Sequence, residues 1–105
     1  MEGSFPVVWT EFAENQLDDI FEYFLAVSGF DPAQKLVQKL IIATKVLELQ
    51  PEVGQIEQAL LNRKEQVRYL VEGNFKILYF LRDGMVIISD VFDTRQSPKR
   101  LKRSL

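Results

Sequence analysis

The sequence predicts an α+β fold in which an antiparallel αα-hairpin packs on a small, mainly antiparallel sheet, in the order β-α-α-β-β-β. Two observations lead to this prediction. Residues 66–96 contain three short runs rich in Val, Ile, Phe and Tyr, separated by turn residues. Before them, two stretches repeat apolar residues at helical spacing. The helical pair is therefore expected to cover one face of the sheet.

The turns 72–74 (Glu-Gly-Asn) and 82–84 (Arg-Asp-Gly) predict a meander of three antiparallel strands. Side-chain alternation then assigns the two faces of each strand, and places Arg68 and Lys76 together as cations on one face. In the second strand the opposed sets are Phe75, Ile77, Tyr79 and Leu81 against Lys76, Leu78 and Phe80. In the third they are Val86, Ile88, Asp90 and Phe92 against Ile87, Ser89, Val91 and Asp93.

The first helix is predicted to begin after Thr10, a good N-cap, and to close at Gly29 in the left-handed conformation. Asp31 as N-cap and Pro32 at the first helical position predict the start of the second helix. It should run until residues 51–54. The apolar stripe of the first helix comprises Ala13, Leu17, Ile20, Phe21, Phe24 and Leu25.

Composition limits what the chain is expected to be. Its 105 residues suit a single domain spanning 1–105, with a short extended segment at residues 5–9 and a basic tail at 95–105. Cysteine and histidine are both absent, so we expect no disulfide, no thiolate chemistry, no metal and no cofactor. No apolar run approaches about 20 residues, so we expect a cytoplasmic domain without a membrane partner.

Charge is unevenly distributed around a net value of −2. Residues 1–61 hold three Lys and ten acidic residues, whereas residues 62–105 hold ten Lys or Arg and five acidic residues. The tail from Arg95 onward has no acid. Such a segment is either a contact for an anionic target or a solubilising terminus. The candidate target-binding residues are Arg95, Lys99, Arg100, Lys102 and Arg103.

The order of elements, with the opening FPVVWTEFAENQLDDIFEYF and the run VRYLVEGNFKILYFLRDGMVIISDVFDTRQSP, resembles the RelE/ParE family of bacterial type II toxin–antitoxin modules. Residues 73–79, GNFKILY, look like the family's Gly-x-Tyr-Arg-Ile-x-Tyr strand. Residues 91–95, VFDTR, look like its closing strand and following Arg. The resemblance spans nearly the whole chain and implies the family fold.

One branch of the family implies a ribosome-dependent mRNA endoribonuclease, which needs cations for the phosphorane and an acid/base pair. Carried over by position, its strand Arg falls on Lys76 and its later Arg on Arg95, with Arg63 or Arg68 as further cations. Two lysines of that branch would fall on Val67 and Tyr69, and its C-terminal Tyr would fall near residue 101. Most of the acid/base set is therefore missing.

The ParE branch implies a toxin that poisons DNA gyrase by binding. This sequence fits the ParE branch better than the ribonuclease branch because it lacks most of the acid/base residues that cleavage requires. A third alternative is a non-toxic member that serves only as a binding domain. In each case the implied partner is a cognate antitoxin, whose apolar anchors would contact the helical hairpin and the free sheet face. The candidate antitoxin-binding residues are Phe21, Phe24, Leu78 and Phe80.

Overall fold

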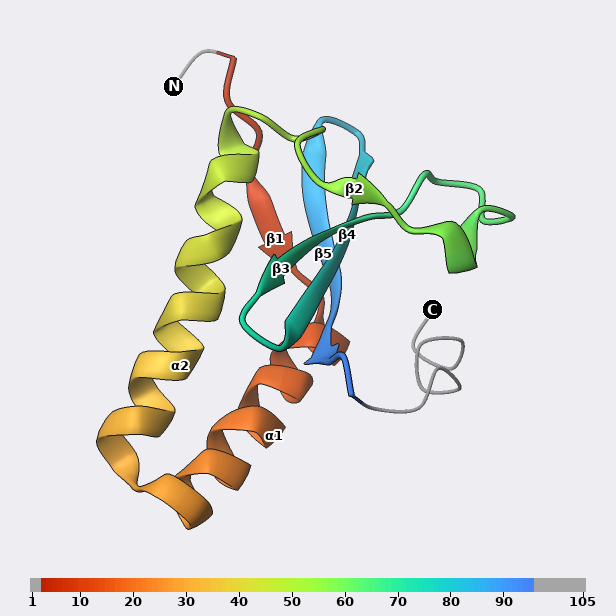
Figure 1. Ribbon diagram of the computed structural model, residues 1–105. Coiled ribbons are helices and arrows are strands. Elements are labelled where there is room, and N and C mark those ends of the chain that lie inside the picture. The colour runs from red at the N-terminus through yellow and green to blue at the C-terminus, as the bar shows by residue number, and fades with distance from the viewer. Residues whose placement is uncertain (1–2, 96–105) are drawn as a thin grey trace.

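The computed structural model describes residues 3–95, which form a five-stranded sheet with a pair of helices on one face (Figure 1). The strand order is β1-β5-β4-β3-β2. This arrangement confirms the predicted α+β class. The elements are β1 (Val7–Trp9), α1 (Glu11–Ser28), α2 (Phe30–Ala43), the 3-10 turn η1 (Thr44–Glu48), β2 (Gln55–Ile56), the 3-10 turn η2 (Gln58–Leu60), β3 (Arg68–Glu72), β4 (Phe75–Arg82) and β5 (Met85–Asp93).

The predicted meander is present, with β3, β4 and β5 pairing antiparallel in sequence order. At the second turn both Asp83 (φ 53°) and Gly84 (φ 75°) have positive φ, as a two-residue hairpin loop matching the strand twist requires. At the first turn Gly73 has φ 59°. The turn residues therefore set the register of the three strands.

Two further strands complete the sheet. β1 lies parallel to β5, with Val7 opposite Val86 and Trp9 opposite Ile88. The short β2 pairs antiparallel with β3 at the other edge, in a segment whose sequence has no clear strand pattern. The two helices form the connection that leads from β1 across to the far edge of the sheet (Figure 1).

A β-bulge in β5 corrects the predicted faces of that strand. Leu78 pairs with Asp90 and Tyr79 with Ile88, so Ser89 is an extra residue between two paired positions. The extra residue reverses the alternation. Asp90 and its neighbour Phe92 therefore lie on the face of Leu78, opposite the face that holds Val86 and Ile88.

Both predicted boundaries of α1, at Thr10 and Gly29, are confirmed, whereas the boundaries of α2 differ from the prediction. Thr10 caps α1, its Oγ1 accepting from the Ala13 amide at 3.0 Å. Gly29 alone joins the helices, with φ 93° and ψ 175°, outside the left-handed region that was predicted. Asp31 and Pro32 lie within the first turn of α2, whose N-cap is Gly29. α2 itself ends at Ala43, earlier than predicted, and continues as η1.

Apolar side chains pack on both faces of the sheet. The main core lies between the helices and the sheet, and includes Leu17, Leu40 and Tyr79. A smaller cluster on the other face comprises Leu60, Val67 and Leu78, with Tyr69 and Phe92 packed against it. The η2 turn and the residues after it thus cover part of the face that the helices leave open. We call this second side the open face.

Candidate functional site

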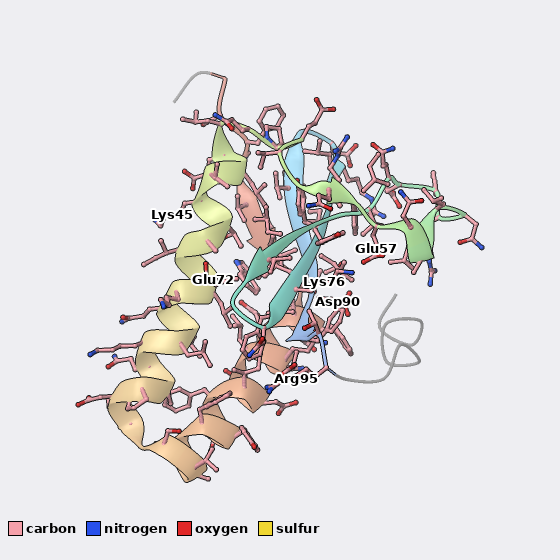
Figure 2. All side chains as sticks on the ribbon, viewed as in Figure 1. Lys45, Glu57, Glu72, Lys76, Asp90 and Arg95 are labelled. Carbon is pink, nitrogen blue, oxygen red and sulfur yellow. The ribbon has the colours of Figure 1, made fainter. Side chains whose placement is uncertain are left out.

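Lys76 is the cation at the strand position of the ribonuclease branch, and it lies on the open face (Figure 2). Its Nζ is 2.5 Å from Glu57 Oε1, and it lies 4.1 Å from the centroid of the Tyr69 ring. Glu57 is buried, with 6% of its surface exposed, and its other oxygen accepts from the Ala59 amide at 3.2 Å. The ammonium group is thus neutralised by a carboxylate of the same chain.

Arg68 lies on the other side of the sheet from Lys76, which corrects the prediction that they share a face. It pairs with Tyr79, whereas Lys76 pairs with Phe92 and Val71. Its guanidinium donates to the carbonyls of Glu52 at 3.2 Å and Gly54 at 2.9 Å. This side chain holds the loop before β2 and does not join Lys76 in a common cluster.

The loop that Arg68 holds is anchored from a second direction. The Gly54 amide donates to the Tyr79 hydroxyl at 2.9 Å, and burial raises the pKa of that hydroxyl. A Cβ added at Gly54 would lie 2.6 Å from the same oxygen. The contact is therefore a structural link between β4 and the segment before β2, and it leaves no space for a larger residue.

Arg95 lies at the end of β5, close to α1 (Figure 2). Its Nη2 is 2.5 Å from Asp93 Oδ2, and its Nε donates to Asp93 Oδ1 at 2.9 Å. This two-pronged contact lowers the pKa of the Asp93 carboxyl and raises the pKa of the Arg95 guanidinium. Arg63, the remaining candidate cation, lies exposed in the loop after η2. Of the predicted cations, Arg68 thus lies on the opposite face from Lys76, whereas Arg63 lines a small pocket together with Glu57, the partner of Lys76.

A groove of about 380 Å³ lies between α1 and the end of β5. Phe24, Phe75 and Phe92 contribute aromatic surface to it, and Phe24 and Phe75 meet edge to face with their ring centroids 6.5 Å apart. Polar groups at its margins include Asp19 of α1 and the Asp93–Arg95 pair. The groove is therefore lined by both aromatic and charged side chains, a combination common in binding sites.

The four predicted antitoxin-binding residues differ in their exposure and in the side chains that surround them. Phe24 lines this groove, whereas Phe21 is partly buried against Phe30, with centroids 6.1 Å apart. Phe80 is partly exposed, and the Arg82 guanidinium lies over its ring, 4.9 Å from the ring centroid. Leu78 is fully buried with Leu60 and Val67, so the expectation that it offers an exposed anchor is wrong.

Residues 96–105, which include Lys99, Arg100, Lys102 and Arg103, lie outside the described part of the chain. Within residues 3–95, no group of three or more acidic side chains is arranged to hold a metal ion. No helix in this part of the chain has the length and apolar character needed to cross a membrane.

Comparison with known proteins identifies the family. The model of the family described as "ParE toxin of type II toxin-antitoxin system, parDE" matches residues 7–98. This chain belongs to the ParE toxin family. The match includes all of the described elements from β1 to β5 and extends into the tail. A search of curated protein sequences finds no match.

Two solved structures share the fold of this ParE-type chain. One, the chromosomal ParDE toxin–antitoxin system from P. aeruginosa, has 20% identity and a TM-score of 0.74 over 88% of this chain and 98% of that chain. The other, the toxin–antitoxin complex RelBE2 from Mycobacterium tuberculosis, has 17% identity and a TM-score of 0.60 over 89% and 94% of the two chains. At these identities the likeness concerns the fold.

Three residues of the ParE-type site were not predicted from the sequence. Glu57 had no signal in its spacing that would mark it as the partner of Lys76 across the sheet. Gln16 carries no charge, yet its Oε1 accepts from the Val91 amide at 2.8 Å. Asp93 was not among the predicted site residues, although its position two residues before Arg95 is a spacing from which the pair could have been anticipated.

Proposed function

We propose that this ParE-type toxin acts by binding an essential target, DNA gyrase, and that a cognate antitoxin neutralises it. The alternative to binding is RNA cleavage, the activity of the ribonuclease branch. The observation that carries it is the 2.5 Å contact between Lys76 and the buried Glu57.

A cleavage site needs cations that are available to the phosphorane as its charge develops. At Lys76 the ammonium charge is already balanced by Glu57, whose carboxylate would also repel an incoming phosphate. Lysine also lacks the planar guanidinium group with which arginine donates two parallel hydrogen bonds to a phosphate. These features support a structural use of Lys76.

The other cations support the same proposal. Arg68 holds backbone carbonyls on the helix side of the sheet, so it cannot act on a substrate together with Lys76. Arg95 is held by Asp93. The positions at which the ribonuclease branch has lysines are occupied by Val67 and Tyr69, which cannot supply an ammonium group. A toxin that acts only by binding needs neither a cluster of available cations nor lysines at these two positions.

For contact with gyrase we propose Arg95 and the basic tail residues Lys99, Arg100, Lys102 and Arg103. These residues carry no acidic neighbour in the tail, and a short basic segment is attracted to an anionic surface of its target. For the antitoxin we propose Phe24 in the α1–β5 groove, with Phe21 and Phe80 as further apolar contacts. Leu78 is excluded by its burial.

Induction in a bacterial host, with translation and DNA damage followed in parallel, tests the proposal. The expected result is gyrase-dependent DNA breaks while protein synthesis continues. A matched strain expressing Lys76→Arg, which keeps the charge beside Glu57, should be equally toxic. A prompt arrest of translation, without DNA breaks, would reject gyrase as the target.

A further inference from the structure

One edge of β5 is covered over only part of its length. β1 pairs with β5 from Val86 to Ile88 and then turns into α1 at Thr10. Beyond Ile88, no described strand pairs with this side of β5, while β4 continues to pair with the other side up to Asp93. The last part of the strand therefore presents a sheet edge, and such an edge is a template for an added strand.

A side chain occupies the first hydrogen-bonding position on that edge. Gln16 Oε1 accepts from the Val91 amide at 2.8 Å. The carbonyl of an added strand would accept from the same amide, so the glutamine occupies the position of such a carbonyl. By alternation, the next backbone groups on this side belong to Asp93. The Thr94 amide points the other way and donates to Asn74 at 2.8 Å.

The α1–β5 groove lies directly beside this edge, since Val91, Phe92 and Asp93 line it. Apolar surface continues from the groove along α1, where Phe12, Tyr23 and Val27 are 47%, 63% and 61% exposed. Their spacing places them on one stripe of the helix together with Gln16 and Asp19. Exposed apolar surface of this extent beside an open edge is typical of a protein interface.

The charge of α1 restricts which partner fits. The helix carries five acidic residues and no Lys or Arg. Asp19 lines the groove, whereas Arg95, the one cation among the described residues that line it, is already balanced by Asp93. An incoming segment that places an acid beside α1 would meet repulsion, and one that places a cation there would be attracted.

From these features we infer that the β5 edge binds an extended segment of the antitoxin as an added strand. The segment carries a large apolar residue that fills the groove and a Lys or Arg two residues away, on the same side of the strand, facing Asp19. This inference rests on the proposed neutralisation by an antitoxin. It names the local chemistry of the partner's contact, which is basic and apolar.

A displayed library of random 12-residue peptides, selected on the full chain, tests the inference and does not require the antitoxin itself. The wild-type chain should enrich peptides with an apolar residue and a Lys or Arg at i and i+2. Asp19→Lys should lose this preference and bind the best peptide about tenfold more weakly. The control is Asp18→Lys, which makes the same charge change on α1 outside the groove and should bind as wild type does.

Hydrogen exchange locates the bound peptide. The Asp93 amide should become protected, while the amides of Val86 and Val91, which already donate to Pro6 and Gln16, should change much less. The inference is overturned if no peptide is enriched, or if Asp18→Lys and Asp19→Lys weaken binding equally. It is also overturned if the Asp93 amide is protected in the chain alone, since the edge would then already be occupied without a partner. These failures leave the toxicity assay, and with it the proposed function, untouched.

Discussion

Lys76 and Glu57 form an ion pair across the open face of the sheet, with Nζ 2.5 Å from Oε1. The pair links β4 to the segment between β2 and η2, and the Tyr69 ring lies beside the ammonium group at 4.1 Å. Only 22% of the Lys76 side chain and 7% of the Glu57 side chain are exposed. In a setting with so little water, loss of either partner leaves the other charge poorly compensated.

We therefore expect Lys76→Met to lower the free energy of unfolding by about 2–4 kcal/mol, because it leaves the buried Glu57 carboxylate without its cation. Urea denaturation at neutral pH measures this change. The double variant Lys76→Met with Glu57→Leu should recover part of the loss, because no unpaired charge remains.

Arg82→Met serves as the matched control for Lys76→Met. It removes a cation from the pair with Glu65, at 2.8 Å, where 53% of the Arg82 side chain is exposed. Exposed pairs contribute little to stability, so this variant should unfold close to the wild-type midpoint. A Lys76→Met chain as stable as Arg82→Met would contradict a structural role for the buried pair.

The Asp93–Arg95 pair predicts a pH dependence. Its hydrogen bonds lower the pKa of Asp93 from an ordinary value of 3.8, so the unfolded chain takes up this proton more readily than the folded chain. The pair thus stabilises the fold above pH 3.8, and this contribution disappears as the pH falls through the lowered pKa. Asp93→Asn should be less stable than wild type at pH 7, and the difference should shrink below pH 3.8. A difference in unfolding midpoint that stays constant with pH would refute this.

Gly54→Ala should destabilise the chain by about 1–3 kcal/mol through overpacking. The new Cβ would lie 2.6 Å from the Tyr79 hydroxyl and 2.8 Å from the Tyr69 carbonyl oxygen, and the latter belongs to the backbone and cannot swing away. Thermal unfolding measures the loss. Gln55→Ala, at the exposed next residue, should change the midpoint much less, and equal effects of the two would rule out the steric cause.

The basic tail gives a prediction for toxicity. Truncation after Pro98 removes Lys99, Arg100, Lys102 and Arg103 but leaves every described element intact. Toxicity on induction should be lost, while co-purification with the antitoxin should persist, because the proposed antitoxin contacts lie on α1 and β5. Full toxicity of the truncated chain would mean that the tail only aids solubility.

Local signals were enough to predict the main elements of this fold. Thr10 predicted the start of α1 because a side-chain oxygen at that position can cap free amides. The sequence Asp83-Gly84 predicted the second hairpin because both residues tolerate positive φ. Such features depend on a few neighbouring residues, so they are visible in the sequence.

Features that depend on an extra residue or a distant partner were not predictable in this way. Alternation assumes an unbroken period of two, and the bulge at Ser89 breaks it, which moved Asp90 and Phe92 to the other face. Gly29 alone joins the two helices because glycine can adopt its φ of 93° without steric strain. The spacing of apolar residues does not predict so short a connection.

The candidate site was predictable as a set of residues but not as an arrangement. Lys76 and Arg95 were identified from their positions, yet their partners were not, because Glu57 is 19 residues from Lys76 and approaches it only through tertiary folding. Leu78 was expected to be a surface anchor because the segment that buries it, around Leu60, has mixed signals.

The most direct test of binding over cleavage uses the purified full chain in a bacterial translation extract. With the Lys76 charge balanced by Glu57, we predict that mRNA stays intact and peptide synthesis continues. The same preparation should inhibit DNA supercoiling by purified gyrase. Cleavage of mRNA in the extract, abolished by Lys76→Ala and by Arg95→Ala in chains that remain folded, would contradict the proposed function.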